Sequence, residues 1–149
     1  MGISQARNEA ALDWGFIQLV WMFLTKVFEE AGPEFHEMGL GPKQMVVLAV
    51  LDTHSTPGGL RDALGAPAST ISNLLNELER KGLIERQVHP VDRRQYHLVR
   101  TTKGQEALAK GASAIEARLA KASEALTPAQ IAAICEARLA IASLLGLGA

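Results

Sequence analysis

Residues 60–104 decide the fold, and they read LRDALGAPASTISNLLNELERKGLIERQVHPVDRRQYHLVRTTKG. Apolar residues recur at helical spacing through the first half, and Gly65-Ala66-Pro67 interrupts them. This pattern predicts a short helix that Gly65 closes and a second helix over about residues 67–81, which Gly82 ends. The second half has β-forming residues on both sides of a polar turn at 89–94, which predicts a β-hairpin with strands 83–89 and 95–100.

The segments on either side of this stretch are predicted to be helical. The expected helices span about residues 4–30, 42–51, 102–126 and 129–145. Gly32-Pro33 is expected to stop the first helix, and Thr127-Pro128 is expected to separate the last two, with Thr127 as the cap. The sequence therefore predicts a mainly α fold with a small β-hairpin wing, in which long N- and C-terminal helices flank a winged helix-turn-helix domain.

Length and composition favour one globular domain. The chain has 149 residues, of which 48% are hydrophobic and 21% are charged, values typical of a folded protein with its own core. No apolar run reaches the roughly 18 residues of a membrane span, and no signal peptide is recognisable. The single cysteine, Cys135, agrees with a reducing compartment, so a cytoplasmic location is expected. Its neighbours on the last helix are apolar, and burial of the thiol is predicted.

The charge distribution points to nucleic acid although the net charge, −1, does not. Residues 80–103 carry seven Lys and Arg side chains against Glu85 and Asp92. A local basic stripe of this kind suits contact with phosphate. A solvated charged face is the simpler alternative, so the stripe gains meaning only from the elements around it.

The predicted order of elements is that of a DNA reader. The second helix of the pair would enter the major groove, where its N-terminal residues meet base edges, and the hairpin arginines would contact the backbone or a narrow minor groove. The candidate DNA-binding residues are Ser69, Thr70, Ser72, Asn73, Asn76, Arg86, Arg93 and Arg94. Simpler roles remain open: Ser69 and Thr70 as helix caps, the asparagines as surface residues, and the tip arginines as solubilising charges.

The stretch from Gly39 to Gly104 resembles the MarR family. The motifs that carry the likeness are Gly39-Leu40-x-x-x-Gln44, Leu60-x-x-x-Leu64-Gly65, Ser69-Thr70-Ile71-Ser72, Leu78-Glu79-x-x-Gly82-Leu83-Ile84, Pro90-x-Asp92-Arg93-Arg94 and Thr101-Thr102-x-Gly104. The resemblance implies a homodimer, an inverted-repeat operator in double-stranded DNA, usually repression, and often release by a small aromatic or anionic effector. It also implies that Asp92 stabilises the wing while Arg94 reaches DNA.

Three residues depart from the family's usual pattern. Asn73 stands where a basic residue is common, which permits a bidentate contact to adenine. Arg61 occupies a position that is usually small, so the packing between the two short helices is expected to differ. Arg100 replaces an apolar residue near the end of the second strand. None of the three removes the core motif.

The resemblance also divides the chain into parts. Residues of about 40–104 would form the DNA-binding core, and those of about 4–30 and 105–146 would form dimerisation helices. Candidate effector-binding residues are Trp14, Trp21, His36 and Met45, since effector pockets are mostly apolar. The same residues could instead fill the core and the dimer seam.

Other classes of function find little support. The four histidines lack the close pairing of a metal site, no catalytic constellation or phosphate-binding loop is present, and neither cofactor nor enzymatic activity is expected. A winged-helix protein that mediates protein–protein contacts and no longer binds DNA remains the alternative function.

Overall fold

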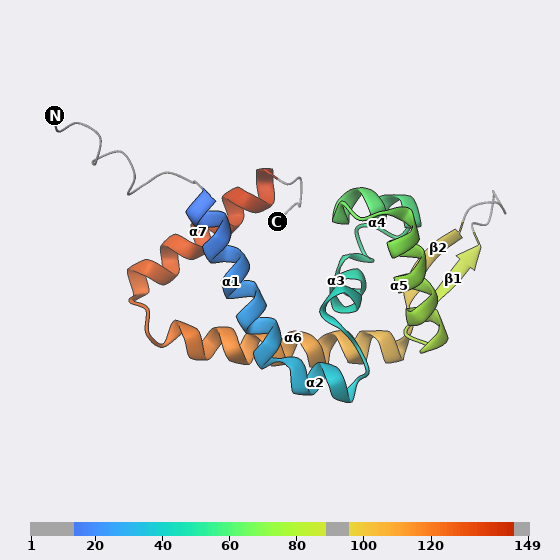
Figure 1. Cartoon of the computed structure of the whole chain (residues 1–149), viewed down its shortest axis with the longest axis horizontal. Coiled ribbons are helices and arrows are strands. Elements are labelled where there is room, and N and C mark those ends of the chain that lie inside the picture. The colour runs from blue at the N-terminus through green and yellow to red at the C-terminus, as the bar shows by residue number, and fades with distance from the viewer. Residues whose placement is uncertain (1–13, 89–95, 145–149) are drawn as a thin grey trace.

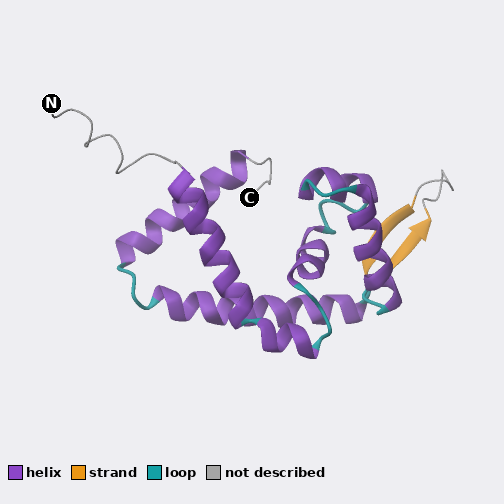
Figure 2. Cartoon of the chain, in the orientation of Figure 1, coloured by secondary structure: helices purple, strands orange, loops and turns teal. Residues whose placement is uncertain are grey.

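A computed structural model describes residues 14–88 and 96–144, which form seven helices and two strands (Figures 1 and 2). The elements are α1 (Trp14–Glu30), α2 (Gly32–Glu37), α3 (Pro42–Val50), α4 (Pro57–Leu64), α5 (Ala68–Arg80), β1 (Ile84–Val88), β2 (Tyr96–Arg100), α6 (Thr102–Ser123) and α7 (Pro128–Leu144). The predicted class, mainly helical with one small hairpin, is confirmed.

The core of the winged part lies between α3, α4, α5 and the hairpin. Each element contributes at least one almost fully buried apolar side chain: Leu48, Leu60, Ile71, Leu75, Leu78, Ile84 and Leu98. The three from α5 recur at helical spacing, so one face of this helix packs inward and the opposite face is left to solvent. Burial of such residues is the main force that holds α5 in place.

The two strands form an antiparallel hairpin. Ile84 pairs with Arg100 at its base, and Val88 pairs with Tyr96 nearest the tip. The backbone N–H of Leu98 also donates to the carbonyl oxygen of Ser55 at 2.7 Å, which attaches the loop before α4 to β2. Residues 89–95, with the predicted DNA-binding and wing residues Asp92, Arg93 and Arg94, lie outside the described part of the chain.

The sequence prediction missed α2. Gly32-Pro33 ends α1 as expected, but it also begins a short second helix because a proline in the first turn needs no intrahelical hydrogen-bond donor. Phe35 of this helix is buried and packs against Phe28 of α1, with ring centroids 6.0 Å apart. The chain therefore bends at this point and places α2 alongside α6.

Helix α6 joins the two ends of the molecule. It runs beneath the winged part at one end and reaches α1 and α7 at the other (Figure 1), and it contacts α1, α2, α3 and β2. Near its middle, Gly111 leaves room for Met45 and Phe35, which an added Cβ would meet at 2.2 and 3.2 Å. No described helix is long and apolar enough to cross a membrane.

Helices α1 and α7 keep much of their apolar surface uncovered within the single chain. More than half of the residue's surface is exposed at Trp14, Ile17, Leu19, Trp21, Met22 and Ile134. Cys135 is exposed as well, so the prediction that this thiol is buried is wrong for the single chain. The reason is that none of residues 14–88 and 96–144 covers the Cys135 thiol.

Candidate nucleic-acid interface

The turn between α4 and α5 is tight and well capped. Thr56 caps the start of α4, where its Oγ1 accepts a hydrogen bond from the N–H of Gly59 at 3.1 Å. Gly65 ends the same helix in the left-handed conformation, with φ of 57°, which glycine adopts without strain. Pro67 then precedes the first turn of α5. This geometry fixes the direction of α5 relative to α4.

The exposed face of α5 carries most of the DNA-binding residues that were predicted on this helix. Its uncharged polar side chains are Ser69, Ser72, Asn73 and Asn76. Their spacing of three, four and seven residues places them on one stripe, opposite the buried face. Thr70 differs, because it is half-buried and turns with Ile71 and Leu74 toward α1. The structure thus brings four of the five candidates together and sets Thr70 apart.

Arg86 connects the hairpin to α5. Its Nη2 donates to Oδ1 of Asn76 at 3.1 Å and lies 3.1 Å from Oε2 of Glu79. Its guanidinium carbon lies 5.1 Å from the centroid of the Tyr96 ring. Two of the predicted DNA-binding residues, Asn76 and Arg86, are therefore bonded to each other across the junction of helix and wing.

Three cations of the basic stripe donate hydrogen bonds to backbone carbonyl oxygens. The side chain of Arg100 is only 11% exposed, donates to the carbonyl oxygen of Leu48 at 2.5 Å and pairs with Asp52. Lys103 donates to the carbonyl oxygen of Lys81 at 2.8 Å, and Lys81 donates to that of Gly39. These three cations stabilise the ends of structural elements, a role that the sequence pattern did not reveal.

A buried glutamine links α3 to α5. Oε1 of Gln44 accepts from the N–H of Gly41 at 2.9 Å and closes the first turn of α3. Nε2 of Gln44 donates to Oε2 of Glu77 at 2.5 Å. Because both polar ends of the side chain are satisfied, its burial carries little penalty and fixes how α5 sits on α3. The motif position of Gln44 was noticed in the sequence, but its contact with Glu77 was not.

A cleft of about 790 Å³ lies between α1, α3 and the start of α5. Trp21 and Phe28 line it from α1, Val46 from α3, and Pro67 and Thr70 from the turn and α5. Glu29 and Lys43 bring one charge of each sign to its lining. The cleft borders directly on the first turn of α5.

The four effector candidates do not gather in one place. Trp21 lines the cleft, whereas Trp14, 79% exposed, and His36 lie outside its lining. Met45 is 4% exposed and packs in the core beside Gly111. Val46 lines the cleft beside Trp21 and Phe28, and the sequence pattern did not point to it, because its place there depends on how α1 and α3 lie relative to each other.

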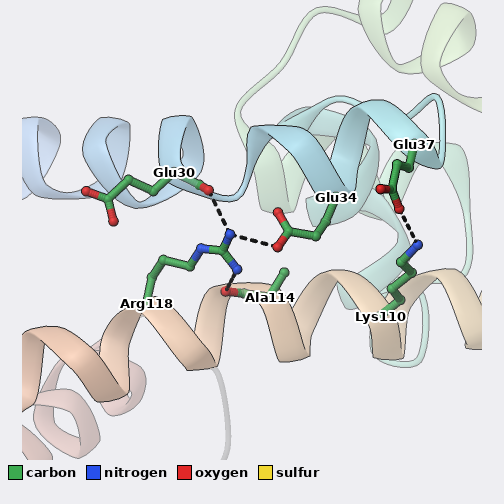
Figure 3. A network of polar contacts seen from close by, with 6 residues as sticks. All are labelled: Glu30, Glu34, Glu37, Lys110, Ala114 and Arg118. Carbon is green, nitrogen blue, oxygen red and sulfur yellow. Dashed lines mark hydrogen bonds and ion pairs between the residues drawn. The ribbon is translucent and has the colours of Figure 1, made fainter.

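Two ion pairs anchor α2 to α6, and a hydrogen bond to the last residue of α1 anchors that helix (Figure 3). Arg118 donates to a carboxylate oxygen of Glu34 at 2.7 Å and to the carbonyl oxygen of Glu30 at 2.9 Å. Lys110 pairs with Glu37 at 2.8 Å. The hydrogen bond from Arg118 lowers the pKa of Glu34, aided by the backbone. The junction of α1 and α2 is thereby held against α6.

A helix pair with a tight turn, an exposed polar stripe on its second helix and a two-stranded hairpin define a winged helix-turn-helix protein. Residues 38–95 match the model of the MarR family. The matched residues run from the end of α2 through α3, α4, α5 and β1, so this part of the chain is similar to the MarR family.

The chain is similar to YfiV, Tm0710 and MepR. YfiV of Bacillus subtilis (strain 168), described as an HTH-type transcriptional regulator, is 29% identical over 98 residues, which cover 62% of this chain and 61% of YfiV. The structure of the transcriptional regulator Tm0710 from Thermotoga maritima is similar, with a TM-score of 0.63 and 26% identity over 90% of this chain and 96% of that one. A mutant of S. aureus MepR bound to an oligodeoxyribonucleotide has the same fold, with a TM-score of 0.60 and 23% identity over 89% and 99% of the two chains.

Proposed function

We propose that this protein is a sequence-specific DNA-binding transcriptional regulator, and that it acts as a dimeric repressor released by a small effector. The observation that carries the proposal is the exposed stripe of Ser69, Ser72, Asn73 and Asn76 on α5, beside a hairpin wing. The description of YfiV as a regulator and the oligodeoxyribonucleotide bound to MepR support it.

In this proposal α5 enters the major groove and the wing follows the adjacent backbone. Asn73 reads a base edge, while Ser69 at the helix start binds phosphate through the free backbone N–H groups there. Arg93 and Arg94 add phosphate or minor-groove contacts, and Asp92 stabilises the wing. Two copies related by a two-fold axis would meet half-sites about one helical turn apart, so the operator is an inverted repeat.

The direct test is a fluorescence-anisotropy titration with DNA that flanks the protein's own gene and with scrambled DNA of equal length. The wild type is expected to prefer the flanking DNA, and Ser72→Ala/Asn73→Ala is expected to lose at least about tenfold in affinity for it. Ser113→Ala is the matched control, because Ser113 is exposed on α6, far along the chain from the interface. A folded wild type that binds no DNA at low salt would favour the alternative, a winged-helix module for protein–protein contacts.

We propose that the effector releases the protein from DNA by binding in the cleft. A ligand there would touch Trp21 of α1 and Thr70 of α5 together, so that binding would bias the position of α5 relative to α1. The aromatic lining suits a planar apolar ring, and Lys43 in the lining suits a carboxylate. The proposed ligand is a small aromatic anion, which Lys43 would attract and Glu29 would repel, so a comparison of ligands of opposite charge decides between the two.

The two tryptophans make this testable. Trp14→Phe leaves Trp21 as the only tryptophan, and its fluorescence is then titrated with benzoate and, as the oppositely charged control, with benzylamine. Benzoate is expected to change the emission saturably and to lower DNA affinity, and Lys43→Met is expected to weaken both effects. Equal responses to both compounds, or none, would remove the aromatic anion from the proposal without touching DNA binding.

Repression is tested separately. A reporter placed behind the flanking DNA should be less active when the wild-type protein is present than when it is absent. Ser72→Ala/Asn73→Ala should restore the reporter, since repression by occupancy requires binding. Higher reporter activity with the wild type would identify an activator.

A further inference from the structure

The contact between Arg86 and α5 has a consequence for how the wing is positioned. We propose that Arg86 is a positioning residue, which sets the angle between the wing and α5 through Asn76, Glu79 and Tyr96 rather than by contacting phosphate. The proposal rests on the proposed DNA-binding function, and it changes the role that the sequence suggested for Arg86 and Asn76.

The four residues form a closed arrangement across two elements. Asn76 and Glu79 are three residues apart on α5 and therefore share a face. Arg86 lies on β1 opposite Leu98, so Tyr96 is its diagonal neighbour on the same face of the hairpin. Each of the two α5 residues thus offers the guanidinium one acceptor oxygen, and each oxygen lies 3.1 Å from Nη2 of Arg86. The wing offers the Tyr96 ring, whose centroid lies 5.1 Å from the guanidinium carbon.

The chemistry of arginine suits this position. Its planar guanidinium offers several donors in a fixed fork and stacks on an aromatic face at the same time, which a lysine ammonium does not. The side chains of Arg86 and Glu79 are 38% and 41% exposed, so the ion pair is screened and contributes little as a charge pair alone. The ion pair matters for geometry, because it orients the wing and α5, which must contact one DNA molecule together.

The pairing also accounts for an acidic residue beside the DNA-facing stripe. Glu79 lies one turn after Asn76, and an unpaired carboxylate there would repel phosphate. Arg86 compensates this charge within the protein. Under the proposal, Glu79 therefore supports DNA binding even though its own charge opposes it.

The first test needs no DNA. The chain contains one tyrosine, so labelling with 3-fluorotyrosine gives a single ¹⁹F resonance that reports on Tyr96. Arg86→Lys and Glu79→Gln are each expected to shift this resonance in the free protein. Glu85→Gln is the matched control, because Glu85 neighbours Arg86 on β1 but points to the opposite face. An unchanged resonance in Arg86→Lys would overturn the proposal whatever the protein does with DNA.

The second test separates positioning from phosphate contact. Arg86→Lys keeps the charge, so a phosphate contact would survive it, whereas loss of positioning should cost about tenfold in affinity. The slope of log K against log salt should stay unchanged, while loss of one phosphate contact would flatten it by about 0.9. A flattened slope in Arg86→Ala would overturn the proposal.

A double-mutant cycle completes the design. Under the proposal, Glu79→Gln weakens binding, and Arg86→Ala/Glu79→Gln costs no more than Arg86→Ala alone, since both remove one interaction. If Arg86 instead contacted phosphate, Glu79→Gln would strengthen DNA binding, because it would free Arg86 from its ion pair. Glu85→Gln is the control, since it also removes one negative charge but leaves that ion pair in place. If the wild type failed to bind DNA, the proposed function would fall while the ¹⁹F result still decided whether the contact exists.

Discussion

Gly104 in the first turn of α6 lies directly against the backbone of Leu83: a Cβ added to Gly104 would lie 1.9 Å from the Leu83 carbonyl oxygen. That oxygen accepts a hydrogen bond from the N–H of Thr101 at 3.1 Å. Oγ1 of Thr101 donates to the carbonyl oxygen of Gly82 at 2.7 Å and accepts from the N–H of Gly104 at 3.1 Å. The residues that lead into β1 and the start of α6 therefore form one packed unit.

We predict that Gly104→Ala destabilises the protein by about 1–3 kcal/mol, because the backbone of Leu83 must move to admit the methyl group. Gly58→Ala, in the first turn of α4, is the matched control, since nothing lies within 4 Å of its added Cβ. This control should leave stability unchanged or raise it slightly. Urea unfolding at one fixed protein concentration measures both, and equal stability of the two variants would contradict the packing argument.

The Glu34–Arg118 pair should make stability depend on acid pH. Because Arg118 lowers the pKa of Glu34 in the folded chain, the pair stabilises the fold at pH values above the unfolded-state pKa of this carboxyl. That contribution is lost as the pH falls through the lower folded-state pKa. Glu34→Gln should therefore be less stable than the wild type at neutral pH, and the difference should shrink in acid.

The measurement is urea unfolding in a series of buffers from neutral to acidic pH. Glu37→Gln is the matched control, because Glu37 makes a similar but more exposed ion pair with Lys110 on the same two helices. Its effect on stability should be small throughout. A constant difference between Glu34→Gln and the wild type at every pH would show that the charge of Glu34 is not the cause.

The uncovered apolar surface of α1 and α7 predicts a homodimer, since exposed apolar area on this scale is usually covered by a partner. Sedimentation at micromolar concentration should give twice the chain mass of 16.0 kDa. Leu19→Glu should shift the protein toward monomer, while Val88→Glu, at an exposed apolar position on the wing, should not. A monomeric wild type would remove the dimer from the proposed function.

Asn73 is predicted to carry base choice. Its side chain is long enough to span N6 and N7 of adenine, which gives about 1–3 kcal/mol of discrimination against other bases. Selection of sites from random DNA should therefore lose one preference per half-site in Asn73→Ala, while the half-site spacing stays fixed by the dimer. Identical motifs from wild type and variant would show that Asn73 takes no part in reading DNA.

Much of the fold was predictable because its helices and strands depend on patterns of nearby residues. Helical periodicity located α5 and its buried face, Gly65 and Gly82 marked helix ends, and two β-rich runs around a polar turn gave the hairpin. Helix α2 was missed because Gly32-Pro33 suits both the end of one helix and the start of the next. Only the packing of Phe35 decides between them.

The sequence by itself determined the order of elements from α3 to α7, the winged-helix class and the polar face of α5, because these depend on residues within one or two turns of one another. Only the tertiary structure decided which polar side chains remain available for a ligand. Arg86 is bonded to α5, and Arg100 binds the carbonyl of Leu48, 52 residues away. Such partners depend on how distant segments pack, and no local pattern records that packing.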